Sequence, residues 1–363
     1  MKTILENVIL SLTSYPARIS TVHLTIESLL DQTVKAEEII LWLAEEEFAN
    51  KEKELPDKLL SLTTKGLTIK WCGNIKSHKK LIPALKKYPE KVIITLDDDI
   101  IYYGKTIETL YNCHIQYPND IIAHRISRHY FDKNNNYIHF DRPMYYDRKS
   151  LTLNYLNSLK KASFFNQQTG CGGVLYPPGC LHNDVLDENK CMTLLPTSDD
   201  LWFWLNGVRK KTKVRVPEIH FPVTQTIPGT QDIGLTTIND KGGFFDQQLN
   251  NIFEAYPEIV EFLQKENDEN LSVINKIINN DDSIKNEIVD QYNNYKKLFK
   301  KTKDKELSKS YYEYIELMLK NDLYSNKKEK NMLLFEFYSK DMQSILIAIR
   351  KIAKKILNIL KRK

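Results

Sequence analysis

The stretch Val-Ile-Ile-Thr-Leu-Asp-Asp-Asp-Ile-Ile, residues 92 to 101, decides the predicted fold. Its first five residues are apolar or β-branched, which is typical of a strand buried on both faces of a parallel sheet. Three carboxylates follow at once, Asp97, Asp98 and Asp99, at the edge where open α/β sheets bind their ligands. In extended backbone Asp97 and Asp99 point to the same side, so they are expected to converge on a metal ion or a metal-bound phosphate. An acidic turn is the alternative interpretation.

Around this stretch, segments with the hydrophobic pattern of strands alternate with segments that have the pattern of helices. Strands are predicted at 8–12, 39–43, 68–72, 92–96 and 121–123, and helices at 21–30, 56–62, 77–88 and 104–116. This alternation predicts a mostly parallel α/β sheet flanked by helices, of the Rossmann-like type. No GxGxxG follows the first strand and no GxxxxGK[ST] occurs, so neither a dinucleotide fingerprint nor a P-loop is present. Residues 124–165 have no clean period and are predicted to form an irregular wall.

Composition restricts the class of protein. The 363 residues are 27% charged and 42% apolar, which is ordinary for a soluble protein of about two domains. Five cysteines with no CxxC pair indicate reduced thiols in a cytoplasmic protein. No signal peptide is apparent, and no apolar run approaches the ~18 residues of a membrane-spanning helix.

Two features downstream attract attention because of their chemistry. The cluster Thr169-Gly170-Cys171-Gly172-Gly173 would let the backbone approach a ligand closely, or form a tight turn. Asp199 and Asp200 stand before Leu-Trp-Phe-Trp-Leu, in what is expected to be the first turn of a helix capped by Thr197 or Ser198. A carboxylate beside such an aromatic wall suits a general base facing a sugar ring, although helix capping alone would also explain the pair.

The C-terminal part has a different character. His220, at the end of a β segment, is either a metal ligand or a core histidine, and residues 224–245 read as a loop or lid. Helical patterns begin at residue 246 and predict an extension over 246–340, which packs on the sheet domain or on a copy of itself, as a homodimer. The predicted catalytic domain is therefore 1–245.

The last segment, 341–363, is predicted to be a basic amphipathic helix. Residues 342–363 carry seven cations and no acid, and since the whole chain carries +5, the rest sums to −2. Isoleucines occupy the face opposite the cations, which is typical of a helix lying on an anionic membrane surface. A packing or dimer helix is the alternative. A near-neutral body with one basic tail argues against nucleic-acid binding.

With these residues in place, the chain resembles the GT-A fold glycosyltransferases, and within them a family 2-like bacterial group that assembles surface polysaccharide or lipooligosaccharide. The resemblance covers roughly residues 6 to 225. It rests on Ser-Leu-Thr-Ser-Tyr-Pro-Ala-Arg at 11–18, on Leu96-Asp97-Asp98-Asp99 as the DxD element, on the turn at 170–173 and on Asp199-Asp200. The second strand ends in Ala44-Glu45-Glu46 instead of the common Asp-Asp-Gly-Ser, which leaves the residue that contacts the base open.

The resemblance implies a nucleotide sugar, with a UDP-sugar favoured, across the carboxyl edge of the sheet. The residues expected to bind it are Thr13, Ser14, Arg18, Glu45, Lys79, Asp97, Asp98, Gly172 and Gly173, with Glu46, Lys80 and His78 as alternatives in their neighbourhoods. Asp97, Asp99 and His220 are expected to hold Mn²⁺ or Mg²⁺, which stabilises the leaving diphosphate as a Lewis acid. In an inverting enzyme, Asp200 or Asp199 would deprotonate the acceptor hydroxyl.

The expected activity is therefore transfer of a sugar, a hexose favoured, to a glycan or lipid-linked acceptor at the inner face of the cell membrane. A sugar nucleotidyltransferase is one rival, but it normally needs a Gly-rich basic loop where Tyr15-Pro16-Ala17 stands. A non-catalytic, membrane-associated carbohydrate-binding scaffold is the other, and it would need neither acidic pair.

Overall fold

The computed structural model describes residues 3–132, 134–139, 160–219, 225–230 and 244–278, with scattered positions between 286 and 333. The chain divides into two compact units, one of Met1–Tyr146 and Asn157–Asn275 and one of Asp147–Leu156 and Lys276–Lys363. In the second unit, the described residues are short helical pieces with Tyr292, Ile315 and Leu333 buried. His220 and the predicted basic helix lie outside the described residues, and the predicted domain limits stay predictions.

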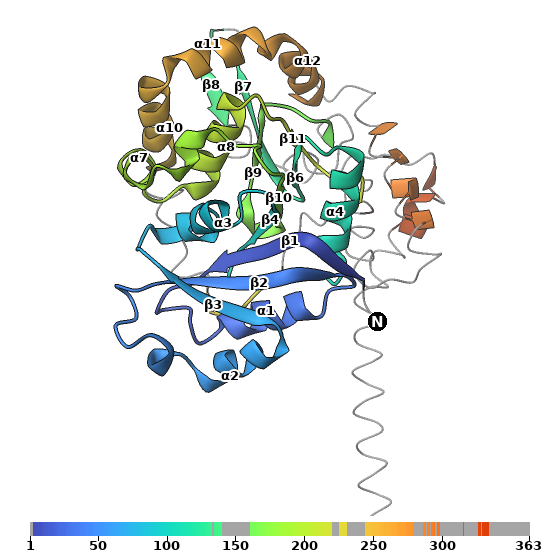
Figure 1. The fold of residues 1–363 in the computed structure, drawn as a ribbon. Coiled ribbons are helices and arrows are strands. Elements are labelled where there is room, and N and C mark those ends of the chain that lie inside the picture. Colours follow the sequence, from blue (N-terminus) through green and yellow to red (C-terminus); the bar gives the residue numbers. More distant parts are fainter. Residues whose placement is uncertain are drawn as a thin grey trace, which may run out of the picture. The chain divides into compact units, whose positions relative to one another are not determined.

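An open seven-stranded sheet is the centre of the first unit (Figure 1). Its strands, in spatial order, are β11 (Val214–Arg215), β6 (Ile121–Ala123), β10 (Val174–Tyr176), β4 (Val92–Leu96), β1 (Ile4–Thr13), β2 (Lys35–Ala44) and β3 (Leu67–Cys72). All neighbours run parallel except β10, which is antiparallel to β4 and to β6. The predicted α/β class, with a mostly parallel sheet flanked by helices, is confirmed.

Helices cover both faces of this sheet, so its central strands bury apolar residues on both sides. Ile9 and Ile93 face one core, with α3 (Ile82–Lys87) and α8 (Asp199–Arg209). Leu10 and Ile94 face the other core, with α1 (Val22–Leu30) and α4 (Thr106–Gln116). All five residues of β4 are buried, as its sequence predicts.

Short elements connect these parts. They are η1 (Lys51–Glu54), α2 (Asp57–Leu60), η2 (Ser61–Lys65), η3 (Lys76–Lys80), β5 (Ile100–Ile101), η4 (Gly170–Gly172), η5 (Asn183–Leu186), α7 (Glu188–Leu194) and β12 (Gln225–Thr226). Pro83 lies in the first turn of α3, where a proline costs no intrahelical hydrogen bond.

A second sheet corrects the sequence-based prediction of an irregular wall at 124–165. It consists of β8 (Tyr137–His139), β7 (Ile126–Phe131) and β9 (Asn166–Gln168), all antiparallel neighbours. β7 reads Ile-Ser-Arg-His-Tyr-Phe and lacks an alternating apolar pattern, because its polar side chains Arg128 and His129 are themselves buried. Their hydrogen-bond partners come from distant segments, so no local pattern could reveal this strand.

Three helices continue the first unit beyond the sheet: α10 (Phe244–Ala255), α11 (Pro257–Lys265) and α12 (Asn267–Ile278). Ile252, Ile259 and Leu263 join the same core as α8. Asn267 and Asn270 bind the backbone of β7, since Asn267 Oδ1 accepts from Phe131 N at 3.2 Å and Asn270 Nδ2 donates to His129 O at 2.9 Å. Over the described residues, no helix is both long and apolar enough to span a membrane.

Candidate active site at the carboxyl ends of β1 and β4

The carboxyl ends of the two central strands lie side by side. Leu12 of β1 is in register with Leu96 of β4, so the residues after each strand meet at the same edge of the sheet. The chain turns at residues 98–99 instead of continuing as a strand, and it resumes as β5. This turn sends the three carboxylates toward two different cations.

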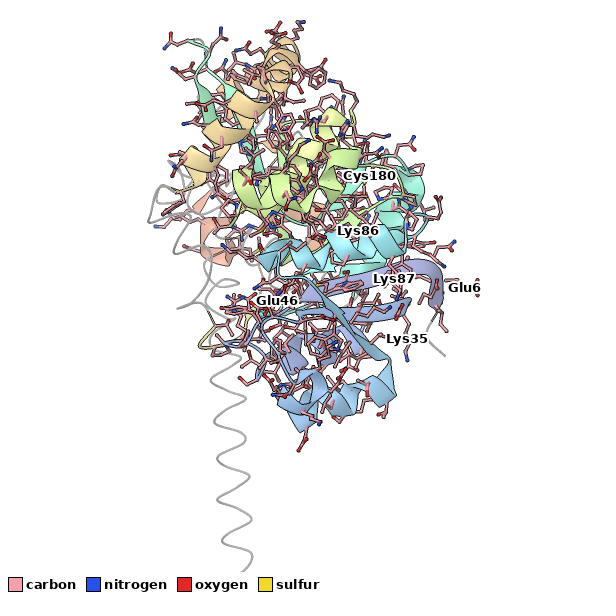
Figure 2. All side chains as sticks on the ribbon, turned by 60° about the vertical axis from the view of Figure 1, so that its left-hand side comes forward. Glu6, Lys35, Glu46, Lys86, Lys87 and Cys180 are labelled. Atoms are coloured by element: carbon pink, nitrogen blue, oxygen red, sulfur yellow. The ribbon has the colours of Figure 1, made fainter. Side chains whose placement is uncertain are left out.

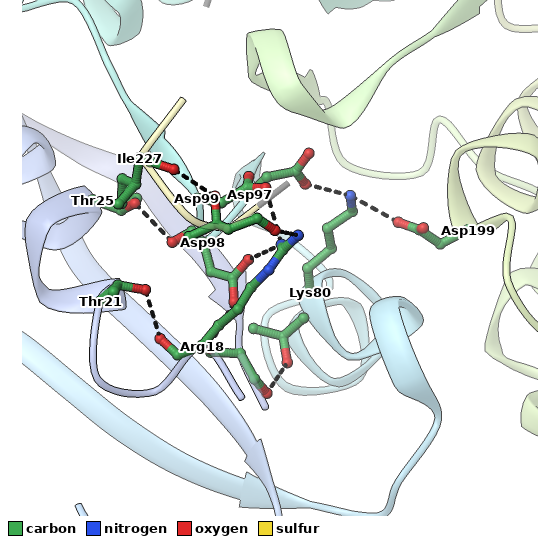
Figure 3. Close-up of polar contacts among 12 residues, drawn as sticks. Arg18, Thr21, Thr25, Lys80, Asp97, Asp98, Asp99, Asp199 and Ile227 are labelled. Atoms are coloured by element: carbon green, nitrogen blue, oxygen red, sulfur yellow. Dashed lines mark hydrogen bonds and ion pairs between the residues drawn. The ribbon is translucent and has the colours of Figure 1, made fainter. Parts of the chain in front are cut away.

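Arg18 is the first cation (Figure 3). Its Nη1 lies 2.8 Å from Asp98 Oδ1 and 3.1 Å from Asp99 Oδ2. Ser14 Oγ donates to the other oxygen of Asp98 at 2.6 Å. Burial raises the pKa of Asp98. The charge of Arg18 and the hydrogen bonds from Arg18 and Ser14 oppose that shift. The cluster joins the segment after β1 to the acidic turn.

Backbone contacts hold the same turn from two sides. Thr25 Oγ1 of α1 donates to the Asp98 carbonyl at 2.9 Å, and Ile227 N donates to the Asp99 carbonyl at 2.8 Å (Figure 3). Arg18 Nη2 donates to the Thr230 carbonyl at 3.0 Å. β12 pairs antiparallel with β5, so the described part of the predicted lid segment, residues 225–230, lies against the acidic turn.

Lys80 is the second cation, and it joins the two acidic pairs that the sequence analysis singled out. Its Nζ lies 2.7 Å from Asp97 Oδ1 and 2.8 Å from Asp199 Oδ2 (Figure 3). The same nitrogen lies 3.7 Å from Asp200 Oδ1. Its carbonyl accepts from Ser11 Oγ at 2.6 Å, which positions the end of η3 against β1. Only 6% of the Lys80 side chain is exposed, so the three carboxylates surround a nearly buried ammonium.

Asp199 and Asp200 begin α8 but have different environments. Burial opposes ionisation of Asp199, but the charge and hydrogen bond of Lys80 outweigh it and lower the pKa of Asp199. Burial and the charges of Asp199 and Asp97 raise the pKa of Asp200 to about 7. The exposed fraction of the side chain is 9% for Asp199 and 28% for Asp200. Asp200 is therefore the more accessible carboxylate, and the one with a pKa suited to a general base near neutral pH.

Gly170 completes this part of the site. Its N–H donates to Asp200 Oδ2 at 2.9 Å. A Cβ at this position would lie 2.4 Å from Lys80 Nζ and 2.8 Å from Asp97 Oδ1. A side chain at position 170 would therefore displace the Lys80 ammonium or the Asp97 carboxylate.

Several predicted residues lie away from this cluster. Lys79 Nζ binds Glu47 at 2.7 Å, and Glu45 pairs with Lys51 at the surface. Gly172 and Gly173 face other parts of the fold. A Cβ added at Gly172 would meet residues 124–125, and one added at Gly173, where φ is +84°, would meet Leu96 and neighbouring side chains. Thr13 Oγ1 donates to the Trp42 carbonyl at 2.8 Å. Ser14, Arg18, Asp97, Asp98, Asp99, Asp199 and Asp200 are the predicted residues that the structure gathers.

Lys80, Ser11 and Gly170 are parts of the cluster that sequence reasoning did not single out as site residues. Lys80 was only an alternative to Lys79, and the 3₁₀ turn η3 sends the two neighbouring side chains to different acids. His78 is fully buried, and burial lowers its pKa to about 4, so its imidazole adds no charge at neutral pH.

The aromatic residues after Asp200 are core residues, which corrects the expectation of a sugar-facing wall. Trp202, Phe203 and Trp204 are at most 1% exposed. Both indole N–H groups donate to carbonyls within the core: Trp202 to Val185 at 3.1 Å and Trp204 to Phe164 at 2.8 Å. Ser198 is the N-cap residue of α8, and its side chain makes no capping hydrogen bond.

The carboxylates fit a hard cation only in part. Asp97 and Asp99 contact different cations, and within the described ranges no group of three or more His, Cys, Asp or Glu side chains could hold a metal. Mg²⁺ and Mn²⁺ commonly take one or two protein carboxylates and complete their shell with phosphate and water. Asp97, 26% exposed beside Asp200, is a donor of that kind.

Two cavities lie elsewhere in the first unit. One, of about 560 Å³, is bordered by β3 and α3 and is lined by Trp42, Ile69, Lys70, Trp71, Cys72, Pro83, Lys86, Lys87 and Glu188. Figure 2 shows Lys86 and Lys87 on α3, next to the half of the sheet that β1, β2 and β3 form. Neither cavity is lined by Asp97, Asp199 or Asp200.

Comparisons with known proteins find only distant structural matches. No protein-family model matches the chain, and no curated protein does. Among solved structures it is similar to a CMP:2-keto-3-deoxy-manno-octonic acid synthetase complexed with CTP, at 14% identity and a TM-score of 0.35, over 68% of this chain and 100% of that one. It is also similar to S. aureus TarS 1-349, at 12% identity and a TM-score of 0.34, over 60% of this chain and 58% of that one. Likeness at this level does not assign a function.

Proposed function

We propose that this protein is a glycosyltransferase that moves a sugar, a hexose favoured, from a nucleotide-sugar donor to a glycan or lipid-linked acceptor in bacterial surface polysaccharide synthesis. The observation that carries the proposal is the meeting of Asp97, Asp199 and Asp200 around Lys80 at the carboxyl edge of the sheet. Ligands of open α/β sheets bind at that edge.

Donor binding is assigned to the two cations and their acids. A nucleoside diphosphate carries negative charge, which Arg18 and Lys80 can attract while the carboxylates keep both side chains in place. Asp98 orients Arg18 by accepting a hydrogen bond from its Nη1, and Ser14 in turn donates a hydrogen bond to Asp98. Mg²⁺ or Mn²⁺, held by Asp97 together with the donor's phosphates, would supply Lewis-acid stabilisation of the leaving diphosphate.

Proton removal is assigned to Asp200. Its partly exposed side chain and its pKa of about 7 let it take the proton of an acceptor hydroxyl, while Asp199 stays ionised against Lys80. The hydrogen bond that Gly170 N–H donates fixes the orientation of the Asp200 carboxylate. Two neighbouring carboxylates with different environments thus have different roles.

Thermal melting against UDP, GDP, CDP and CMP, each with Mn²⁺ and with EDTA, tests the donor assignment. We expect one nucleoside diphosphate, UDP favoured, to raise the melting temperature in the presence of metal, because a ligand of the native state stabilises it by mass action. No shift with any nucleotide at millimolar concentration would favour the scaffold alternative.

Product analysis separates the two enzyme classes. A glycosyltransferase releases the nucleotide from a nucleotide sugar when an acceptor glycan is supplied. A sugar nucleotidyltransferase instead releases pyrophosphate from a nucleoside triphosphate and a sugar or sugar phosphate. Release of pyrophosphate would contradict our proposal and show a nucleotidyltransferase.

We also propose, from the sequence of residues 342–363 alone, that the protein binds the inner face of the cell membrane peripherally. Seven cations opposite an isoleucine face support this proposal. The full chain should sediment with vesicles containing anionic lipid, less so at high salt, and a chain ending at residue 340 should not. Equal sedimentation of both chains would contradict it.

A further inference from the structure

Arg128 is a buried cation outside the acidic cluster. It lies on β7 and is 5% exposed. Its Nε donates to Asn270 Oδ1 at 2.8 Å, and its Nη1 donates to Asn166 Oδ1 at 2.5 Å. Both partners are neutral amides, and within the described ranges no carboxylate forms an ion pair with this guanidinium.

A buried charge without a counter-ion is costly, since burial removes its hydration. Burial accordingly lowers the pKa of Arg128 to about 10, and the charge of Glu269 opposes the shift only in part. The amides of Asn166 and Asn270 orient the guanidinium but supply no negative charge. The remaining terminal nitrogen, Nη2, forms no hydrogen bond with described residues and stays available for an acceptor.

A cavity of about 100 Å³ lies at this guanidinium. Its lining includes two more cations, Lys161 and Lys213, and two acids, Glu266 and Glu269, so that three positive side chains face two negative ones. Both lysines are exposed and neither has an ion-pair partner within the described residues. A few waters or one small oxyanion fit this volume.

We propose that this cavity binds a small oxyanion, a phosphate or carboxylate group, with Arg128 at its floor and Lys161 and Lys213 at its mouth. The guanidinium fork suits oxyanions because it offers several N–H donors in one plane. The site is separate from the acidic cluster, although β9 connects the two: Asn166 begins the strand that leads to Gly170.

The test uses the full chain, with inorganic phosphate and acetate as probes and sodium chloride at matched ionic strength as the reference. We expect phosphate, acetate or both to raise the melting temperature beyond the chloride reference, and the arm that responds identifies the anion class. If neither anion exceeds chloride, the proposal is wrong.

Substitutions at the mouth keep the test independent of folding. The double variant Lys161→Ala/Lys213→Ala should bind the responding anion about tenfold more weakly, because two charge-assisted contacts are lost. The matched control, Lys58→Ala/Lys65→Ala, removes two exposed lysines elsewhere in the first unit and should respond like the unchanged protein. Equal anion responses in both double variants would overturn the proposal.

Two further variants change the charge balance at the guanidinium itself. Glu269→Gln removes a like charge for the anion and should tighten binding, whereas Arg128→Gln should abolish the anion response if that variant folds. A weaker anion response in Glu269→Gln would contradict the expected repulsion and would count against an oxyanion site.

Discussion

The Lys80 ammonium lies 2.8 Å from a carboxylate oxygen of Asp199 and so connects the segment after β3 to the first turn of α8, 119 positions later in the chain. Because the same nitrogen lies 2.7 Å from Asp97, one side chain forms ion pairs with acids from two separate motifs. The stability of this sheet edge and its proposed chemistry therefore depend on the same cation.

Replacing Lys80 tests that dependence. Lys80→Met keeps the stem but leaves Asp97 and Asp199 without their counter-ion, and it should lower the free energy of unfolding by about 3–5 kcal/mol and abolish nucleotide binding. Urea denaturation and nucleotide titration measure the two effects. Lys86→Met is the control, because Lys86 pairs with Glu188 in an exposed position and its loss should cost at most about 1 kcal/mol. Unchanged nucleotide affinity in folded Lys80→Met would remove Lys80 from the donor site.

Asp200 should control the pH dependence of turnover. A general base acts in its deprotonated form, so the rate should rise as the pH increases through about 7, the pKa that burial gives Asp200. Asp200→Asn should lose about 10²–10⁴-fold in turnover and lack this rise. Asp246→Asn is the matched control, since Asp246 also lies in the first turn of a helix and is exposed. An intact pH–rate profile in Asp200→Asn would exclude Asp200 as the base.

The same pKa predicts the sign of a stability change with pH. A carboxyl group whose pKa is raised to about 7 in the folded chain, from about 4 in the unfolded chain, binds more protons when folded between those pH values. The free energy of unfolding contributed by Asp200 should therefore fall as the pH rises from about 4 to about 7. Denaturation of the unchanged protein and of Asp200→Asn at pH 5 and 8 isolates this contribution. If the difference between the two proteins were the same at both pH values, the raised pKa would be contradicted.

Gly170 should tolerate no side chain. Gly170→Ala places a Cβ where Lys80 Nζ and Asp97 Oδ1 lie, and should cost about 1–3 kcal/mol and displace the Lys80 cluster, with loss of activity. Gly73→Ala provides the comparison, because its Cβ would meet only a Glu46 oxygen at 3.9 Å. Thermal melting and turnover measure both variants. An active, equally stable Gly170→Ala protein would show that the close backbone approach is dispensable.

Much of this molecule could be predicted from the amino-acid sequence. The apolar strand at 92–96, its acidic end and the alternation of strands with helices follow from local periodicity, because each of these elements buries its own apolar face. The Asp97–Asp99 and Asp199–Asp200 pairs could be singled out because charge at the end of a buried strand or in the first turn of a helix is a local feature. The mixed direction of the sheet, by contrast, depends on β10, which is only three residues long.

Only the tertiary structure decided which charges meet. Lys79 and Lys80 are indistinguishable in sequence, and the η3 turn assigns one to Glu47 and the other to the acidic cluster. Trp202 and Trp204 could have faced a ligand, but their indole N–H groups find carbonyl partners within the core. Strand β7 exists because α12 and β9 supply amides for its buried Arg128. Local sequence determines where a strand or helix forms, whereas the partner of a buried polar group comes from a distant segment and is decided only when the chain packs.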